Sequence, residues 1–365
     1  MDANGLGMGF LVVGAGFLGA QRAAAAMAAK GCRLVAVHDC DERAARGVAG
    51  QHGARVAPDY AEALTWDAVD AVVVATPHAD HAGQIRMALE AGKHVLCEKP
   101  LTIRPDEARA LAILADTRRV RLATGLNHRF YPPVRDALAL VGSWAIGRVE
   151  SVRAEIGHKA SPEFLSSWHT DAERSGGGTL MDNGPHACDL VRKFLGEVVS
   201  AKGNVRNIVR PGCETEAYGF FRDFDRGYGE VRCTWTNPSG YLNIDVRGSE
   251  GHLRVETAPW RLTGELANGR RLRNRYLGER LAERRFRGLF GCERSFVREL
   301  ESFVSTPWGQ PRLEATGWDG CRVTEMIDAI YVSDRSGEEV PLKPLHITLP
   351  SIAKRRASVY REQWT

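Results

Sequence analysis

The chain has 365 residues, of which 44% are hydrophobic and 26% charged, and its formal net charge at pH 7 is +4. This length predicts two domains, and the composition is that of an ordinary soluble globular protein. The net charge is too small to indicate a nucleic acid or a membrane surface as a partner. No apolar run approaches the roughly 20 residues that cross a bilayer.

The N-terminal residues lack the basic segment with which a signal peptide begins. The eight cysteines are scattered along the chain, without a C-x-x-C pair. Because disulfide frameworks and zinc sites normally show clustered cysteines, we expect a reducing, cytoplasmic location and no metal site.

The first 125 residues alternate short apolar runs with helical patterns. The expected strands are residues 10–13, 33–37, 71–75, 94–97 and 121–125, and the expected helices are residues 21–30, 81–91 and 105–116. Continuous Val and Ala runs between helices are typical of a parallel sheet covered on both faces. We therefore expect an N-terminal α/β domain over residues 1–127, with the doubly wound parallel sheet of a Rossmann fold.

Beyond about residue 130 the expected strands follow one another directly. They are residues 148–156, 198–205, 216–224, 229–236, 241–247 and 252–257, with helices near 185–195, 291–304 and 317–333. Consecutive strands predict a mixed or antiparallel sheet, and hence a C-terminal α+β domain over residues 128–365.

One segment, residues 270–287, carries eight arginines and two glutamates. A solvated helix or loop is the ordinary interpretation of such a cluster. A contact with a phosphate-bearing substrate or with another subunit remains open for it.

A glycine-rich turn lies between the first expected strand and the first expected helix, and it reads Gly14-Ala15-Gly16-Phe17-Leu18-Gly19. Its first glycine allows a tight turn, its second lets the backbone approach a pyrophosphate, and its third lets the helix pack closely on the strand. The free N–H groups at the start of the helix favour phosphate. The turn predicts a bound dinucleotide.

Asp39 lies twenty residues beyond Gly19, at the end of the second expected strand, where a carboxylate can bind the ribose hydroxyls of NAD. Cys40 and Asp41 offer no positive charge to the extra phosphate of NADP. We therefore expect NAD as the cofactor, with NADP left open by the nearby Arg43.

Three later segments carry polar groups suited to chemistry. They are Thr76-Pro77-His78-Ala79-Asp80-His81, Glu98-Lys99-Pro100, and Asp182-Asn183-Gly184-Pro185-His186 after a triple glycine. The first two follow expected strands of the parallel sheet, and ligands of such sheets bind beyond the carboxyl ends of the strands. The third opens the helix expected near residues 185–195.

Together these motifs resemble the glucose–fructose oxidoreductase / inositol dehydrogenase (GFO/IDH/MocA-like) family of sugar and cyclitol dehydrogenases. The resemblance covers nearly the whole chain and includes residues 14–19, 98–100, 125–130, 176–186 and 317–333. It implies a Rossmann domain followed by a domain with a large open sheet, through which homodimers or homotetramers form. It also implies a sugar or cyclitol pocket between the domains, with Lys99, Asp182 and His186 at the catalytic positions.

These three residue types suit hydride transfer. Oxidation of an alcohol needs a base, and the pKa of histidine makes His186 a suitable one. His186 lies in the first turn of its helix, where the positive helix end would disfavour the imidazolium. Lys99 would stabilise the developing alkoxide, and Asp182 would orient His186 or bind a neighbouring hydroxyl. Whether His186 or Lys99 takes the proton is open, and we favour His186.

Further residues complete the expected site. For the cofactor they are Gly14, Gly16, Phe17, Leu18, Gly19, Asp39, Thr76, Pro77, His78, His81, Glu98, Lys99 and Asn127, and for the substrate Lys99, His128, Trp168, His169, Asp182 and His186. A structural role is equally open for His78 and His81, and Pro100 is a position for a cis peptide. Where relatives commonly have Trp-Arg, this chain has Trp168-His169. Asp189 and Lys193 are expected to form an ordinary pair one helical turn apart.

The predicted function is NAD-dependent oxidation or reduction at a CH–OH group of a sugar, sugar derivative or cyclitol. Two alternatives stay open. One is a glycosidase that retains NAD and oxidises its sugar transiently, and the other is a catalytically inactive, cofactor-sensing regulator.

Overall fold

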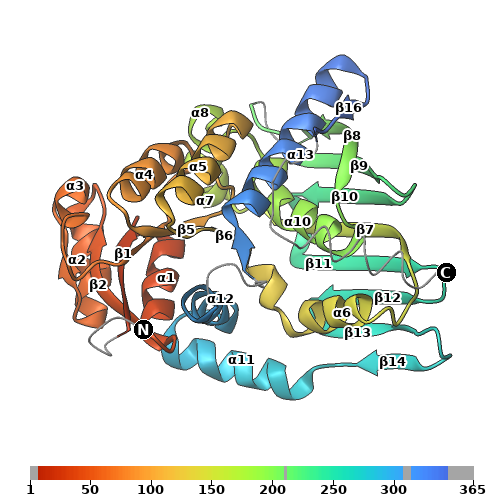
Figure 1. Ribbon diagram of the computed structural model, residues 1–365, viewed down its shortest axis with the longest axis horizontal. Coiled ribbons are helices and arrows are strands. Elements are labelled where there is room, and N and C mark those ends of the chain that lie inside the picture. The colour runs from red at the N-terminus through yellow and green to blue at the C-terminus, as the bar shows by residue number, and fades with distance from the viewer. Residues whose placement is uncertain (1–6, 209–211, 307–313, 344–365) are drawn as a thin grey trace.

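The computed structural model describes residues 7–208, 212–306 and 314–343. Two sheets lie next to each other in the molecule, one of seven strands and one of nine (Figure 1). In the described part of the chain, no helix is long and apolar enough to cross a membrane.

The first sheet has the strand order β15-β6-β5-β4-β1-β2-β3. Its strands are β1 (Met8–Val13), β2 (Cys32–His38), β3 (Arg55–Val56), β4 (Ala71–Val74), β5 (His94–Glu98), β6 (Leu122–Gly125) and β15 (Ala315–Thr316). All pairs are parallel except β15 with β6. The order reverses between β1 and β4, which is where a doubly wound sheet binds its ligand. The predicted Rossmann-type domain is confirmed.

The helices of this half are α1 (Phe17–Ala28), α2 (Glu42–His52), α3 (Tyr60–Ala63), α4 (His78–Glu90) and α5 (Pro105–Arg118), followed by the short η1 (Asn127–Phe130). The sequence patterns missed α2 and α3. They also placed the start of α1 four residues too late, because the helix begins directly after Gly16 and includes the third glycine of the turn.

The second sheet has the order β14-β13-β12-β11-β7-β10-β9-β8-β16. Its strands are β7 (Val149–Lys159), β8 (Val198–Arg206), β9 (Glu216–Asp223), β10 (Tyr228–Thr234), β11 (Thr236–Gly248), β12 (His252–Thr257), β13 (Trp260–Glu265), β14 (Arg271–Asn274) and β16 (Val340–Pro341). Only β7 and β10 pair in parallel, so the predicted mixed sheet is confirmed. The strands β13, β14 and β16 were not among the expected strands.

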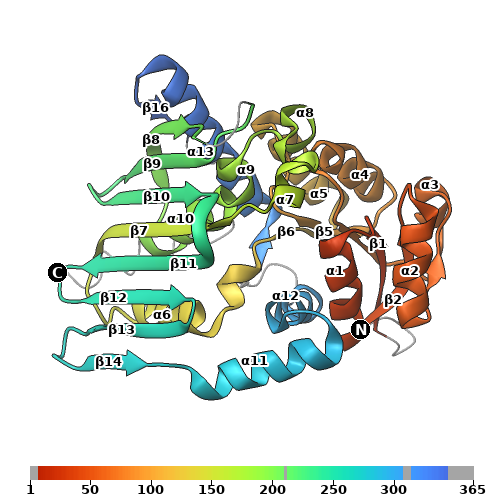
Figure 2. The same ribbon diagram turned by 180° about the vertical axis from the view of Figure 1, so that it is seen from behind.

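Three helices cover one face of this sheet: α6 (Pro132–Gly142), α10 (Gly184–Leu195) and α13 (Gly317–Ser336). Figure 2 shows the strands β10–β14 from the other side, facing the viewer. Between the two sheets lie the short helices α7 (Pro162–Leu165), η2 (Trp168–Thr170), α8 (Ala172–Ser175) and α9 (Thr179–Asp182).

The chain returns to the first sheet after residue 290. The helix α12 (Arg294–Ser305) packs Phe296, Leu300 and Phe303 into the same apolar cluster as Phe10 of β1. The strand β15 then pairs with β6. Strands β1–β6 lie before residue 127 and β7–β14 lie after it, whereas α12 and β15 come from beyond residue 127 and belong with the first sheet.

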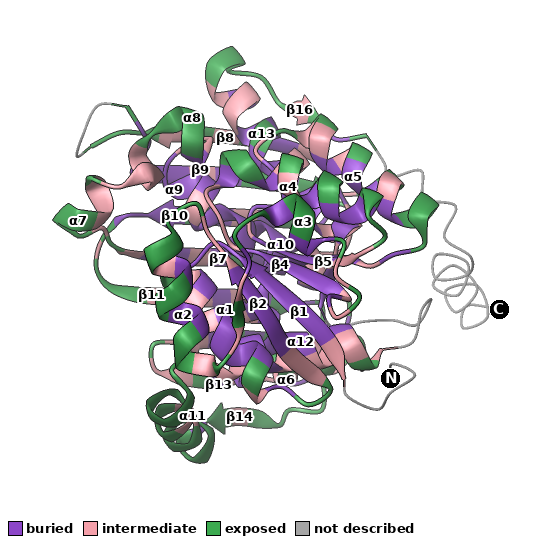
Figure 3. Cartoon of the chain, turned by 90° about the vertical axis from the view of Figure 1, so that its left-hand side faces the viewer, coloured by how far each residue is buried: buried purple, intermediate pink, exposed green. Residues whose placement is uncertain are grey.

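The arginine-rich segment forms β14 and the helix α11 (Leu277–Phe290), which runs along the lower edge of the molecule in Figure 1. Residues of α11 are exposed or half-buried, and the helix is mainly green in Figure 3, whereas β1, β4 and β5 of the first sheet are mainly purple. The ordinary interpretation of this segment as a solvated helix agrees with the structure.

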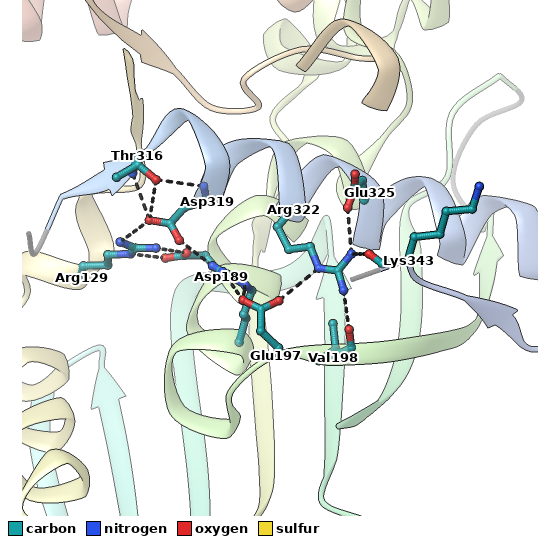
Figure 4. Close-up of polar contacts among 10 residues, drawn as sticks. Arg129, Asp189, Glu197, Val198, Thr316, Asp319, Arg322, Glu325 and Lys343 are labelled. Atoms are coloured by element: carbon teal, nitrogen blue, oxygen red, sulfur yellow. Dashed lines mark hydrogen bonds and ion pairs between the residues drawn. The ribbon is translucent and has the colours of Figure 1, made fainter. Parts of the chain in front are cut away.

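A buried network of charges joins η1, α10 and α13 (Figure 4). Arg129 Nε donates to Asp189 Oδ2 at 2.7 Å, and Arg129 Nη1 lies 3.3 Å from Asp319 Oδ2. Asp319 also forms a capping box with Thr316 at the start of α13. The expected Asp189–Lys193 surface pair is therefore wrong: Asp189 is buried because its helix packs against η1, and its partner is Arg129.

Candidate active site

The glycine turn has the backbone that a dinucleotide needs. Gly14 has φ = +92°, a conformation that L side chains rarely adopt, and a Cβ there would lie 2.5 Å from the Ala75 carbonyl oxygen. A Cβ on Gly19 would lie 1.8 Å from the Gly14 carbonyl oxygen, whereas one on Gly16 would meet no atom within 4 Å. The first and third glycines are thus required by the fold, and the second leaves open space beside the N-terminus of α1. These features fit a dinucleotide.

The Asp39 carboxylate lies beside this turn, at the end of β2. Its Oδ2 accepts a hydrogen bond from the Ala15 N–H at 2.6 Å, and its Oδ1 accepts one from the Asp41 N–H at 2.8 Å. Partial burial opposes ionisation, but these two N–H groups lower the pKa of Asp39 below its usual value. An ionised carboxylate is therefore held at the edge of the turn.

Lys99 directly follows β5, and its peptide bond to Pro100 is cis. The Lys99 ammonium donates to Asp182 Oδ1 at 2.7 Å and to the Asp182 carbonyl oxygen at 2.8 Å. The structure therefore brings together two of the three expected catalytic residues.

Asp182 ends the short helix α9. Its second carboxylate oxygen accepts a hydrogen bond from Trp235 Nε1 at 3.1 Å, and the sequence patterns did not single out Trp235. Burial opposes the ionised form, but the adjacent Lys99 charge holds the pKa of Asp182 well below its usual value. Glu214 fixes the start of α9, because its carboxylate accepts from the N–H groups of Gly178 and Leu180 at 2.8 and 2.9 Å.

His186 lies in the first turn of α10 and its ring stacks on that of His128, with centroids 3.7 Å apart. The Nδ1 atom of His186 is buried and has no hydrogen-bond partner among the described residues. Burial, then the neighbouring His128, Lys99 and Arg22, lower the pKa of His186 well below its usual value. The expected neutral ring agrees with this direction, but burial is its main cause. The Asp182 carboxylate accepts hydrogen bonds from Lys99 and Trp235, and it makes none with His186 Nδ1. It therefore does not orient the His186 ring through that atom.

Other histidines surround the same ammonium. Burial and the Lys99 charge lower the pKa of His128 to about 3. Burial also lowers the pKa of His169 to about 4, with Asp182 opposing and Lys99 adding to the shift. The His169 ring lies between Trp168 and Phe164, with centroids at 3.9 and 4.3 Å. The Lys99 charge thus acts on both His128 and His169, and Trp168 stacks on His169.

His78 and His81, both in α4, contact segments next to the site. His78 contacts the end of α8, and His81 contacts the segments that follow β4 and β5. His78 Nδ1 lies 2.7 Å from the Ser175 carbonyl oxygen, and the His78 ring meets the Trp168 ring edge-on at 4.8 Å. His81 is fully buried, with Nδ1 at 2.8 Å from the Pro100 carbonyl oxygen and Nε2 at 3.0 Å from that of Thr76. Burial lowers the pKa of both rings. These contacts favour the structural alternative for both histidines, and their role at the cofactor stays a prediction.

The remaining expected cofactor residues line the same end of the first sheet. Pro77 precedes α4, the Thr76 hydroxyl donates to Gln84 Oε1 at 2.6 Å, and the Asn127 amide donates to Ser295 Oγ at 2.9 Å. Phe17 is 81% exposed at the start of α1.

Glu98 belongs to a buried cluster that the sequence patterns missed. Arg22 of α1 donates from Nε to Glu98 Oε1 and from Nη1 to Glu299 Oε2, both at 2.6 Å. Glu98 Oε2 accepts from the Lys99 N–H at 3.3 Å. Burial raises the pKa of Glu299 to about 7, against the lowering effect of Arg22. An arginine inside an alanine-rich helix looks solvent-exposed in sequence, and only the packing of α12 reveals its burial.

A cavity of about 310 Å³ opens next to His128. Its lining includes groups that sequence reasoning did not name as site residues, among them Tyr131, His158, Asn183, Tyr241, Trp260, Arg287 and Glu293. In the described ranges, no three His, Cys, Asp or Glu side chains are placed to hold a metal ion.

Residues 8–126 match the family model described as "Oxidoreductase family, NAD-binding Rossmann fold", and residues 134–254 match the "GFO/IDH/MocA C-terminal domain". The chain is also 34% identical over 334 residues to an inositol 2-dehydrogenase of Rhizobium meliloti, an alignment that covers 88% of this chain and 94% of the relative. The chain belongs to the GFO/IDH/MocA family. It is an NAD(P)-dependent oxidoreductase of the sugar and inositol dehydrogenase type, which acts on CH–OH groups.

Two further similarities bear on the cofactor. The D-xylose 1-dehydrogenase (NADP(+)) 2 of Haloferax volcanii is 29% identical over 92% of this chain and all of the relative. A crystal structure of GenD2 from gentamicin A biosynthesis, in complex with NAD, has a TM-score of 0.76 at 30% identity, over 93% of this chain and 97% of that one. One relative of this GFO/IDH/MocA member is therefore named for NADP, whereas one similar structure contains NAD.

Proposed function

We propose that this chain transfers a hydride between NAD and a secondary alcohol or ketone of a sugar, a sugar derivative or a cyclitol. The observation that carries the proposal is the contact between Lys99 and Asp182, 2.7 Å apart, within a group of histidines that burial keeps neutral. Alcohol oxidation is assisted by a base that accepts the hydroxyl proton and by a positive charge that stabilises the developing alkoxide. A neutral imidazole can be the base, and the Lys99 ammonium can supply the positive charge.

His186 is the proposed base. A neutral imidazole can accept the hydroxyl proton during oxidation and return it during reduction, and the low pKa of His186 supports the neutral form. The unpartnered Nδ1 supports the same role, because a buried polar atom normally has a partner and a substrate hydroxyl would supply one.

Lys99 is the proposed donor to the reacting oxygen. Its ammonium has three N–H bonds, and Asp182 accepts from it through the carboxylate and the main chain. A remaining N–H can stabilise the negative charge that develops on the substrate oxygen. Asp182 holds Lys99 in place, and Trp235 holds Asp182.

NAD, when bound, supplies the nicotinamide carbon that takes up the hydride. Asp39 supports NAD over NADP, because its ionised carboxylate beside the glycine turn suits ribose hydroxyls and repels a 2′-phosphate. The backbone at Gly14–Gly19, together with Thr76, Pro77 and Asn127, completes the proposed cofactor site. Glu98 would act through Arg22 and through the Lys99 main chain.

The proposed substrate neighbours of Lys99 are His128, Trp168 and His169.

We also propose a homodimer or homotetramer formed through the nine-stranded sheet, on which Phe220 and Tyr228 are 53% and 51% exposed. None of the eight cysteines, all of which lie in the described ranges, forms a disulfide, and this supports a reducing cytoplasm as the location.

A substrate panel tests this function. The protein is mixed with NAD and, in turn, with several sugars and cyclitols, and reduced nicotinamide is followed by its absorbance. Substrate-dependent NADH formation is the expected result. Cleavage of a nitrophenyl glycoside without net NADH would instead indicate the NAD-retaining glycosidase. Tight NAD binding without turnover of any substrate would indicate a sensor.

A further inference from the structure

The cavity beside His128 adjoins the reacting groups, but Lys99, Asp182 and His186 are not part of its lining. The lining includes His128, whose ring stacks on His186, and Asn183, the residue after Asp182. It also includes Trp260, Arg287 and Glu293. Its residues come from η1, β7, β11, the turn into β13, and α11, so distant parts of the chain build one space.

A row of rings leads from His186 to the lining of this cavity. His128 stacks on His186 with centroids 3.7 Å apart, Tyr131 stacks on His128 at 4.6 Å, and Trp260 lies 5.9 Å from Tyr131. Apolar ring surfaces with a few polar groups are typical of small-molecule sites. Trp260 is thus the third ring from the proposed base, and a group bound against it is separate from the ring that reacts at His186.

Among the described residues, the charged side chains of the cavity lining are Arg287 and Glu293, one of each sign. Arg287 Nη2 lies 2.7 Å from Glu293 Oε1 and 3.9 Å from Glu283 Oε1. The hydroxyl of Tyr131 donates to the second oxygen of Glu293 at 3.2 Å. A phosphate group on the substrate would be repelled by these carboxylates. An ammonium group on the substrate would be repelled by the guanidinium of Arg287. A neutral hydroxyl can both donate to Glu293 and accept from Arg287.

We infer that this cavity is a specificity subsite for a second, uncharged, hydroxylated unit of the substrate, attached to the sugar or cyclitol ring that is oxidised. Arg287 and Glu293 bind the hydroxyls of the second unit, and Trp260 packs against its apolar face. The arginine-rich helix α11 thus contributes one side chain to recognition of a neutral substrate, and phosphorylated substrates are disfavoured. This inference rests on the proposed function.

The test compares one-ring and two-ring substrates by NADH formation. The one-ring set is D-xylose, D-glucose and myo-inositol, the charged set is D-glucose 6-phosphate and D-glucosamine, and the two-ring set is cellobiose, maltose and trehalose. The best two-ring substrate is expected to have a kcat/KM at least about tenfold above the best one-ring or charged substrate, as hydrogen-bonded specificity sites achieve.

Three variants locate the effect. Arg287→Met and Trp260→Leu should each lower the ratio of two-ring to one-ring kcat/KM by about tenfold, because each removes contacts made only with the second unit. Arg284→Met is the matched control, since Arg284 is an exposed arginine of the same helix that does not line the cavity. It should leave the ratio unchanged.

A preference for one-ring or phosphorylated substrates overturns the inference while leaving the proposed function standing. An unchanged ratio in both Arg287→Met and Trp260→Leu does the same. Absence of NADH with every substrate overturns the inference and the proposed function together.

Discussion

Lys99 Nζ lies 2.7 Å from Asp182 Oδ1, and this ion pair links the two halves of the molecule at the reacting centre. Lys99 follows β5 of the seven-stranded sheet, whereas Asp182 ends α9, which packs on β9 and β10 of the nine-stranded sheet. Both side chains are largely buried, with 13% and 14% exposed. A change in the packing of the two halves would therefore move the ammonium relative to the substrate.

The first prediction concerns the Lys99 side chain. Lys99→Met removes the proposed donor to the reacting oxygen and should lower kcat by at least about 10²-fold, the usual cost of losing such a donor. Binding of NAD, followed by nicotinamide fluorescence or calorimetry, should change little. Lys99→Arg keeps the charge but alters the geometry, and it should also be impaired. Near-normal kcat in Lys99→Met would remove Lys99 from its role.

The second prediction concerns the proposed base. His186→Ala should reduce turnover by at least ~10²-fold because general-base catalysis is lost, while NAD still binds. His252→Ala is the matched control, because His252 is an exposed histidine of β12 and should leave turnover unchanged. An enzyme that keeps its turnover without His186 would transfer the role of base to Lys99 or a neighbouring ring.

The third prediction concerns cofactor choice. Asp39→Ala should weaken NAD binding and relax discrimination against NADP, because the carboxylate that suits ribose hydroxyls and repels the 2′-phosphate is gone. The ratio of kcat/KM for the two cofactors measures the effect. Asp67→Ala serves as control, because Asp67 is an exposed aspartate that precedes β4, at the opposite end of the parallel sheet. Unchanged cofactor preference in Asp39→Ala would contradict this role.

Much of this site was predictable from local motifs. The glycine turn, Lys99 and His186 occur in short patterns whose position after a strand or at a helix start follows from chain order. Trp235 lies between β10 and β11, and Trp260 begins β13. No local pattern in these segments tells which side chains face the other half of the chain. Asp182 and His186 are four residues apart, which suggests contact within one helix. However, α9 ends at Asp182 and α10 begins at Gly184, so the two residues lie on separate helices and the Asp182 carboxylate contacts Lys99 instead.

Arg22 and Arg129 show a second limit of sequence reasoning. Both are fully buried, and each is held by carboxylates more than 50 residues away in the chain. Their burial depends on the return of α12 and α13 to the first half of the molecule, which no local pattern encodes. For the same reason, α12 and β15 belong with the first sheet although they follow residue 127, the expected domain boundary.

The fourth prediction concerns pH and stability. The folded protein keeps His78, His128, His169 and His186 at lowered pKa values, about 3 for His128 and about 4 for His169. Below the unfolded pKa near 6.5 the unfolded chain binds more protons than the folded one, so the free energy of unfolding falls as pH falls. Each histidine contributes up to about 1.4 kcal/mol per pH unit.

Unfolding by urea at a series of pH values between 8 and 4 measures this dependence. Replacing His128 by Gln should flatten the slope between pH 6.5 and 4, because one lowered pKa is removed. A slope that is the same in this variant, or a free energy of unfolding that rises towards acid pH, would contradict the assignment.

The fifth prediction concerns the network in Figure 4. Asp189→Ala leaves Arg129 buried with less compensation and should destabilise the protein by about 3–5 kcal/mol. Asp245→Ala is the control, because Asp245 pairs with Arg254 on the exposed sheet face and such pairs contribute under about 1 kcal/mol. Urea unfolding compares the two variants. Equal losses in both would show that the Arg129–Asp189 pair is not a special source of stability.

The most direct test of hydride transfer follows the hydrogen itself. A sugar or cyclitol deuterated at the carbon that bears the reacting hydroxyl is incubated with the protein and NAD, and the reduced cofactor is analysed by mass spectrometry. The account predicts one deuterium in each NADH formed, and a loss of this product of at least ~10²-fold in His186→Ala. Reduced cofactor without deuterium, or no reduced cofactor with any such substrate, would contradict it.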